Sequence, residues 1–231
     1  MKKYKHIFFD LDRTLWDFDK NSHEAYQEIY EKYNLSQRGV RSFEAFTKSY
    51  LRHNDELWAL YVEGKIEKSY LTWRRFEVTL LDFGIDDPEL AKQIGHDYIT
   101  ISPQKTNLFP NSIEILDYLQ QHYSLHIITN GFEEVQFNKL RNAGLDKYFD
   151  KVITSEAAGC KKPEDCIFNY ALQKAKALPA ESLMIGDDIE VDIIGAQNVG
   201  MDTVFFNPNR IAHNGGIQAE IFDLIELKKL I

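Results

Sequence analysis

Two aspartates follow a short apolar run near the start of the chain, in the segment His6-Ile7-Phe8-Phe9-Asp10-Leu11-Asp12. Because side chains alternate along a strand, Asp10 and Asp12 would emerge on the same side of the strand end, where open parallel sheets bind ligands. Carboxylates held that close repel each other unless a metal ion or another cation neutralises them. The simpler alternative is a strand that ends in a solvated acidic turn, because aspartate is common in turns. The other polar segments of the chain distinguish these two interpretations.

Two further segments carry polar groups suited to an anion. Thr129-Asn130-Gly131 ends an apolar run with a hydroxyl, an amide and a glycine whose backbone an oxyanion can approach. Lys161-Lys162-Pro163 places two cations before an expected helix, whose N-terminus itself attracts anions. Taken singly, a helix N-cap and solvated lysines explain these segments equally well.

A fourth segment, Gly186-Asp187-Asp188 with Asp192, places three acids within six residues beside an apolar run. Their mutual repulsion is unfavourable without a cation. Carboxylate oxygens suit Mg²⁺, which usually takes one or two protein carboxylates and keeps waters and substrate phosphate as its other ligands. The four segments together predict phosphoryl transfer on a small phosphorylated metabolite, with Mg²⁺ as the cofactor.

Short apolar runs must place these groups at strand ends. Pro110 precedes an expected helix over residues 112–121, and Gly144 and Gly200 follow expected helices over 133–143 and 192–199. Strands that alternate with helices predict an α/β fold with a doubly wound parallel sheet. The expected strands cover residues 6–10, 125–130, 151–155, 183–187 and 203–207.

A long insertion interrupts this alternation. More than a hundred residues separate Asp10 from Thr129, whereas a crossover between parallel strands needs about a dozen. Helix signals fill the interval: a capping-box pattern at Asn21-x-x-Glu24, an N-cap with proline at Asp87-Pro88, and helix stops at Gly64 and Gly84. We expect a catalytic core formed by residues 1–15 and 106–231, with an inserted α-helical cap domain over 16–105.

Composition limits the partners and the compartment. A formal net charge of −9 over 231 residues argues against nucleic acid polymers and anionic membranes as partners. Cys160 and Cys166 have no histidine neighbours that would complete a metal site, so we expect reduced thiols of a cytoplasmic protein. The initial Met-Lys-Lys precedes an apolar run that Asp10 soon interrupts, which is too short for a signal peptide.

The four ordered segments resemble the motifs of the haloacid dehalogenase superfamily. The matching residues are Asp10-x-Asp12-x-Thr14, Thr129, Lys162-Pro163, and Gly186-Asp187 with Asp192. The helical insertion resembles a C1-type cap. Thr129-Asn130-Gly131-Phe132, the Lys-Pro motif and the overall spacing are most similar to the pyrimidine nucleoside 5'-monophosphatase branch.

This resemblance implies roles for the matching residues. Asp10 would attack phosphorus and form an aspartyl phosphate, and Asp12 would protonate the leaving oxygen and then activate water. Mg²⁺ would lie between Asp10, Asp187 and the backbone carbonyl of Asp12. Thr129 and Lys162, with Asn130 and Gly131 beside them, would bind the phosphoryl oxygens.

The same resemblance gives Asp192, Asp188 and Arg13 no single role. Asp192 would support Lys162 or a metal-bound water. Asp188 and Arg13 differ from the residues common in the superfamily, which leaves both roles open. Trp16 lies just after the first motif and is a candidate to stack on a substrate base.

Two other functions stay open. A phosphatase of another metabolite, phosphoglycolate or a sugar phosphate, would use the same motifs. A non-turnover aspartyl-phosphate signalling or binding module also has acids, a Thr or Ser and a Lys, but its phosphoacceptor lies on a later strand and it lacks a large insertion. Dehalogenases resemble this framework without the second acid, so Asp12 favours phosphate esters.

Overall fold

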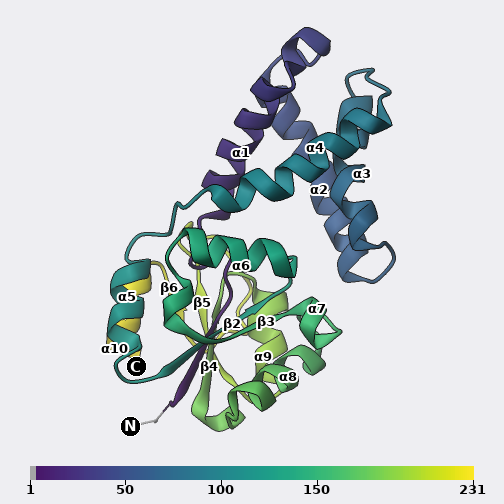
Figure 1. The fold of residues 1–231 in the computed structure, drawn as a ribbon. Helices are drawn as coiled ribbons and strands as arrows, with labels where there is room; N and C mark the ends of the chain where they lie inside the picture. Colours follow the sequence, from purple (N-terminus) through teal and green to yellow (C-terminus); the bar gives the residue numbers. More distant parts are fainter. Residues whose placement is uncertain (1–3) are drawn as a thin grey trace. The chain divides into compact units, whose positions relative to one another are not determined.

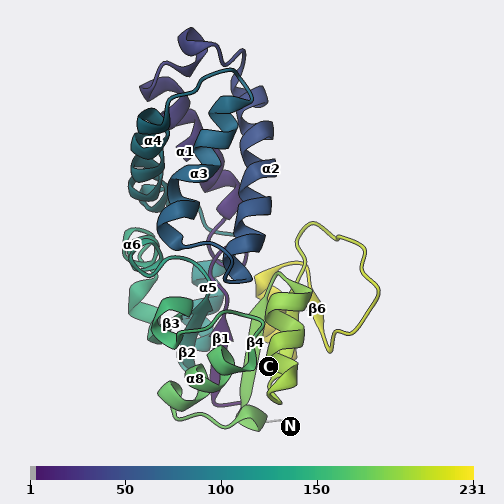
Figure 2. The same ribbon diagram turned by 90° about the vertical axis from the view of Figure 1, so that its right-hand side faces the viewer.

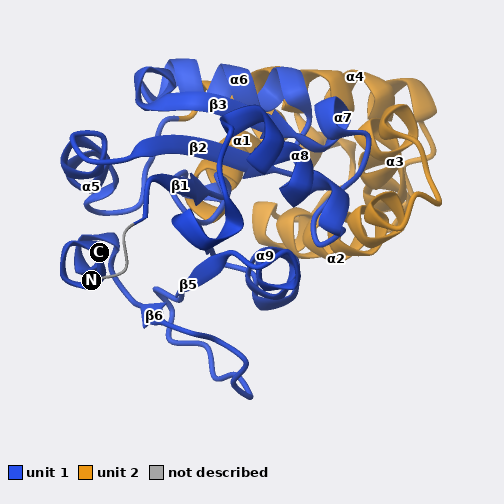
Figure 3. Ribbon diagram, turned by 90° about the horizontal axis from the view of Figure 1, so that it is seen from below, with its two compact units in different colours: residues 1–18, 106–231 blue, residues 19–105 orange. Residues whose placement is uncertain are grey.

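The computed structural model describes residues 4–231, so the initial Met-Lys-Lys lies outside the described residues. The chain forms two compact units, coloured separately in Figure 3. Residues 1–18 and 106–231 form the first unit, and residues 19–105 form the second. No helix within residues 4–231 is long and apolar enough to cross a bilayer.

The first unit is built on a six-stranded sheet with the order β3-β2-β1-β4-β5-β6, in which every pairing is parallel. This order confirms the doubly wound sheet, because the chain builds outward from β1 to β3 and then returns to add β4 to β6 on the other side. All five expected strands are present. The strands are β1 (His6–Phe9), β2 (Ser124–Thr129), β3 (Phe149–Thr154), β4 (Ser182–Gly186), β5 (Asp202–Phe206) and β6 (Glu220–Ile221).

The sixth strand, β6, was not expected from the sequence. It contains only two residues and follows a long loop over 207–219, which Figure 2 shows extending from the end of β5. A two-residue strand is too short to show an apolar alternation, so its pairing with β5 is determined by tertiary structure.

Helices cover both faces of the sheet (Figure 1). Ile7 and Phe9 pack with apolar side chains of α5, α6 and α10, whereas Phe8 packs with those of α8 and α9. The alternation along β1 thus supplies two separate apolar cores. The helices of this unit are α5 (Ser112–Leu119), α6 (Glu133–Asn142), α7 (Ser155–Ala158), α8 (Asp165–Ala175), α9 (Gly195–Asn198) and α10 (Leu227–Leu230).

The helix expected over 192–199 differs from the one observed. A π-helical turn over Ile189–Ile194 precedes α9, so helical structure begins three residues earlier than predicted. The Asp188 side chain accepts a hydrogen bond from the Val191 backbone N–H at 2.9 Å and caps this turn. The prediction therefore missed Asp188 as the N-cap.

The second unit is helical, as expected. Tyr26, Phe46, Tyr50 and Phe76 are buried in one aromatic core, with Tyr50 and Phe76 ring centres 4.7 Å apart. These aromatic residues of the insertion are therefore core residues. Its helices are α1 (Phe18–Lys32), α2 (Phe43–Val62), α3 (Lys68–Leu81) and α4 (Pro88–Ile101).

One of the two predicted helix starts in this unit is correct. The Asp87 side chain accepts a hydrogen bond from the Leu90 backbone N–H at 2.9 Å, which confirms the N-cap of α4. The capping box at Asn21 is wrong, because α1 begins at Phe18 and Asn21 is buried inside it. Local spacing suggested a start one turn too late.

Residues 15–17 and 107–109, where the chain leaves and re-enters the first unit, form a short backbone ladder. Trp16 and Leu108 form an antiparallel bridge. The Asp17 backbone N–H donates to the Asn107 carbonyl at 3.0 Å, and the Phe109 N–H donates to the Leu15 carbonyl at 3.0 Å. The two ends of the helical segment are therefore held next to each other.

Candidate active site

The carboxyl ends of β1, β2 and β4 bring together polar groups that are distant in sequence. Asp10 directly follows β1, Thr129 ends β2, and Asp187 directly follows β4. Phe9 at the end of β1 is level with Ile127 of β2 and Ile185 of β4. These three groups thus lie at the switch point of the sheet, where doubly wound folds bind ligands.

A buried lysine joins two of the acids. Lys162 Nζ donates to Oδ1 of Asp10 and to Oδ1 of Asp192, both at 2.6 Å. Burial alone would lower the pKa of Lys162, but the charges of Asp10 and Asp192 outweigh it and raise that pKa above its usual value. Lys162 therefore carries a positive charge beside Asp10.

Three acids of the first unit lie close enough to share a cation. Asp10, Asp187 and Asp192 each offer a carboxylate oxygen, and these oxygens lie within 4.8 Å of one another. Burial raises the pKa of Asp187 to about 9, and repulsion by Asp10 and Asp192 contributes to the rise. Burial raises the pKa of Asp10 to about 7, although the Lys162 charge opposes this. One ammonium group faces three carboxylates, so hard oxygen donors and excess negative charge fit a divalent ion such as Mg²⁺.

Two neighbours fix the position of Asp192. The Asp188 backbone N–H donates to Oδ2 of Asp192 at 3.2 Å, while the exposed Asp188 side chain caps the π-helical turn. A Cβ at Gly186 would lie 2.3 Å from the same oxygen, so only glycine leaves room for this carboxylate. The extra acid at position 188 therefore has a structural partner.

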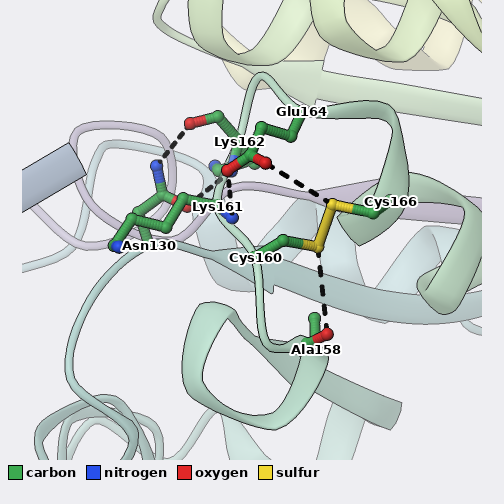
Figure 4. The surroundings of a disulfide bond; sticks show 7 residues. All are labelled: Asn130, Ala158, Cys160, Lys161, Lys162, Glu164 and Cys166. Atoms are coloured by element: carbon green, nitrogen blue, oxygen red, sulfur yellow. Dashed lines mark hydrogen bonds between the residues drawn. A yellow bond between two sulfur atoms is a disulfide. The ribbon is translucent and has the colours of Figure 1, made fainter. Parts of the chain in front are cut away.

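Asn130 holds the backbone of Lys162. Its Oδ1 accepts from the Lys162 N–H at 2.8 Å, and its Nδ2 donates to the Lys162 carbonyl at 2.9 Å (Figure 4). The Asn130 amide, which we expected to contact substrate, thus positions the loop that carries Lys162. Thr129 Oγ1 accepts from the Gly131 backbone N–H at 3.1 Å.

The expectation of reduced thiols is wrong for this structure. Cys160 and Cys166 form a disulfide on either side of Lys162 (Figure 4). Their Cα atoms are 6.4 Å apart, within the range that a disulfide spans. The expectation rested on the absence of a metal-ligand pattern and on an expected cytoplasmic location. Neither shows that the segment between Cys160 and Cys166 brings both sulfurs together.

The stacking role expected for Trp16 also disagrees with the structure. Trp16 is fully buried in the apolar core of the first unit, and Lys139 Nζ lies 4.2 Å from its ring centre. A buried ring in this position packs over a cation and has no exposed face for a base. Arg13, whose role was open, lies 4.5 Å from the Phe18 ring centre, and its charge opposes the rise in the pKa of Asp187.

The family model described as haloacid dehalogenase-like hydrolase matches residues 7–206. This chain belongs to that family. The pyrimidine 5'-nucleotidase YjjG of Escherichia coli is 32% identical to this hydrolase over 99% of the chain and 98% of its own length. The pyrimidine 5'-nucleotidase PynA of Streptococcus pneumoniae is 31% identical over 91% of the chain and 87% of its own length.

A solved structure shares the architecture of this hydrolase. The HAD-hydrolase YfnB of Bacillus subtilis, bound to magnesium, superposes with a TM-score of 0.89 at 28% identity, and the match covers 99% of both chains. The expected fold and family are therefore confirmed, and a similar fold binds the expected metal in that protein.

The sequence assigned no specific role to three polar residues that contact the acids of this hydrolase. Gln136 and Lys139 of α6 both donate to the Asp12 carboxylate. Thr14 Oγ1 donates to Oδ1 of Asp187 at 3.3 Å, although the sequence gave Thr14 no role beyond its place in the motif. The spacing of Gln136 and Lys139 indicates one helix face, but it does not identify the strand end that this face meets.

The cluster of Asp10, Asp187 and Asp192 leads to a prediction about metal binding and thermal stability. We expect metal-free Asp187→Asn protein to unfold at a higher temperature than the wild type near pH 8. Because burial raises the pKa of Asp187 from 3.8 to about 9, ionisation of this carboxyl group costs no stability below about pH 4 and costs progressively more as pH rises toward 9. For a chain of this size, each kcal/mol gained raises the unfolding temperature by about 2 to 4 °C.

Added Mg²⁺ should reverse this order, because a ligand that binds only the folded state stabilises it. Scanning calorimetry should show a magnesium-induced rise for the wild type and little rise for Asp187→Asn. Asp188→Asn is the matched control, since asparagine caps a helix as well as aspartate does. A full magnesium shift in Asp187→Asn would contradict a role for Asp187 as a metal ligand.

Proposed function

We propose that this protein is a Mg²⁺-dependent phosphomonoester hydrolase that acts through an aspartyl phosphate on Asp10. The proposal rests on the hydrogen bonding of the two Asp10 carboxylate oxygens. Lys162 holds Oδ1, and no group within residues 4–231 donates a hydrogen bond to Oδ2. One oxygen is therefore fixed by a cation, while the other is available to attack phosphorus.

The two aspartates of the first motif divide the reaction. Asp10 Oδ2 forms a bond to phosphorus while the bond from phosphorus to the leaving oxygen breaks, and Asp12 transfers its proton to that oxygen. Asp12 then removes a proton from water as the water oxygen attacks the phosphoryl group on Asp10. Inorganic phosphate leaves, and Asp10 returns to its carboxylate form.

The other residues of the site stabilise negative charge on the phosphoryl group. Lys162 neutralises the phosphoryl oxygens through its fixed ammonium, and the Thr129 hydroxyl lies at the end of the neighbouring strand as a second donor. Asp10 and Asp187, with the backbone carbonyl of Asp12, would hold Mg²⁺, which supplies electrostatic stabilisation of the phosphoryl charge.

We further propose that the substrate is a pyrimidine nucleoside 5'-monophosphate, with a preference for deoxyribose. Support comes from the names of YjjG and PynA, two relatives that align over most of this chain. The inserted helical segment was expected over residues 16–105, but residues 16–18 belong to the first unit. We assign the second unit, residues 19–105, as a cap that would select the leaving group. The physiological partner is then a small phosphorylated metabolite.

A substrate panel tests this function directly. With Mg²⁺ present, we expect deoxyuridine and deoxythymidine monophosphates to give kcat/KM values about tenfold or more above purine monophosphates, phosphoglycolate and hexose phosphates. Discrimination should appear in kcat/KM because contacts to the remote base assist the transition state. A hexose phosphate or phosphoglycolate that wins by that margin would refute the nucleotide assignment and leave the phosphatase in place. Full activity in excess chelator would refute the metal requirement.

A further inference from the structure

Both carboxylate oxygens of Asp12 are held by side chains from a single turn of α6. Lys139 Nζ donates to Oδ1 at 2.6 Å, and Gln136 Nε2 donates to Oδ2 at 2.9 Å. Residues three apart lie on the same face of a helix, so one helical face supplies both donors. With two donors from one rigid element, the Asp12 carboxylate can hold a single orientation.

Lys139 is a buried cation whose hydrogen-bond acceptor is Asp12. Its side chain is 4% exposed, against 24% for Asp12. The Trp16 ring centre lies 4.2 Å from Nζ and the Phe18 ring centre lies 5.6 Å from it. An ammonium in such surroundings is costly to bury unless it is paired, and the rings and carboxylate together fix where it lies. The contact is thus unlike a mobile surface ion pair.

Gln136 is fixed from its other side as well. The same Nε2 donates to Thr129 Oγ1 at 2.6 Å, so its two hydrogens bind Asp12 and Thr129. Its Oε1 is buried and has no hydrogen-bond partner in the described chain. A flipped amide would turn Oε1 toward a carboxylate oxygen, which repels it, so the acceptor determines the orientation. The Gln136 amide thus leaves its Oε1 without a hydrogen bond, which is unfavourable, so that both N–H groups can bind Asp12 and Thr129.

Gly131 makes room for this arrangement. A Cβ at position 131 would lie 2.5 Å from Gln136 Cδ and 2.6 Å from Nε2. Any larger residue would displace the amide from Thr129 and Asp12. The glycine that the sequence associated with an oxyanion is therefore also required for the position of Gln136.

We propose that Lys139 and Gln136 are positioning residues that orient the Asp12 carboxylate for its two proton transfers. This inference rests on the proposed phosphatase function. A carboxylate has about four acceptor positions, so two hydrogen bonds leave room for the proton that Asp12 donates and later accepts. Lys139 acts through Asp12 alone, whereas Gln136 contacts both Asp12 and Thr129.

Leaving-group dependence separates this role from general stabilisation. Lys139→Met should lower kcat/KM for an alkyl phosphate such as deoxyuridine monophosphate by about 10²-fold, the scale on which proton transfer assists catalysis. The loss for p-nitrophenyl phosphate should be at least about tenfold smaller, because that leaving group needs little protonation. Lys139→Arg should recover most of the activity. Arg141→Met, which removes an exposed cation two residues along the same helix, should match the wild type on both esters.

A double-mutant cycle with Asp12→Asn completes the test. Lys139→Met should cost little in the Asp12→Asn background, because residues that act through one group are not additive. Equal losses on both esters, or additive losses in the cycle, would overturn the inference. If Lys139→Met does not fold cooperatively, the ratio of the two losses in Gln136→Met provides the comparison, because the lost contact to Thr129 affects both esters. A wild type that is inactive on both esters would refute the proposed function itself, and the inference with it.

Discussion

Asp10→Asn is expected to abolish turnover, lowering kcat by about 10⁴-fold or more, the scale seen when other enzymes lose a covalent nucleophile. The amide cannot form the bond to phosphorus that Asp10 Oδ2 forms in the proposed reaction. Intact-protein mass spectrometry after mixing with p-nitrophenyl phosphate should therefore detect no added phosphoryl group on this variant.

Asp12→Asn should behave differently, because it keeps the nucleophile and loses the proton donor and acceptor. With an ester whose leaving group needs little protonation, this variant should form the phosphoenzyme and hydrolyse it slowly. The added phosphoryl mass should accumulate and map to the peptide that contains Asp10. Phosphorylation of Asp10→Asn protein at any other residue would contradict the assignment.

Lys162→Ala is the second change with a very large expected effect. It removes the ammonium that lies 2.6 Å from both Asp10 and Asp192, and kcat should fall by about 10² to 10³-fold, as on removal of one fixed electrostatic group. The variant should also unfold more easily, because breaking a buried ion pair leaves uncompensated charge and typically costs about 3 to 5 kcal/mol. Steady-state kinetics and calorimetry on the same samples measure both effects.

Lys161→Ala is the matched control for that experiment. The two lysines are adjacent in sequence, but Lys162 is 2% exposed and contacts the acids, whereas Lys161 is only partly buried. Its loss should change kcat by less than about threefold, the scale of a surface ion pair. Equal losses in the two variants would show that the loop, and not the Lys162 charge, is what catalysis needs.

The sequence was most informative where a local pattern alone determines structure. An apolar run followed at once by Asp10 or Asp187 indicates a buried strand with a polar end, and both strands were found there. The parallel, doubly wound sheet was predicted correctly, because alternating strands and helices permit few sheet topologies. The N-cap at Asp87 was predicted correctly since capping depends on neighbours within one turn.

Features that depend on tertiary contacts were missed. Gln136 and Lys139 are ordinary polar residues in an amphipathic helix, and only the packing of α6 beside Asp12 gives them a partner. Trp16 was expected to face substrate because of its place in the sequence, but the sheet core buries it. Asn130 has a side chain suited to binding an oxyanion, yet it bonds to the backbone of a loop that lies 32 residues further along the chain.

The backbone ladder between residues 15–17 and 107–109 has a consequence for how such proteins diversify. Since the ladder joins the two ends of the intervening segment, the closure entropy of that segment changes by only about 0.6 kcal/mol for each doubling of its length. Segments of very different size and composition can thus be exchanged at this point with little thermodynamic penalty to the sheet. Natural selection, or a protein engineer building chimaeras, can replace the inserted helical segment while the ends of β1, β2 and β4 stay intact.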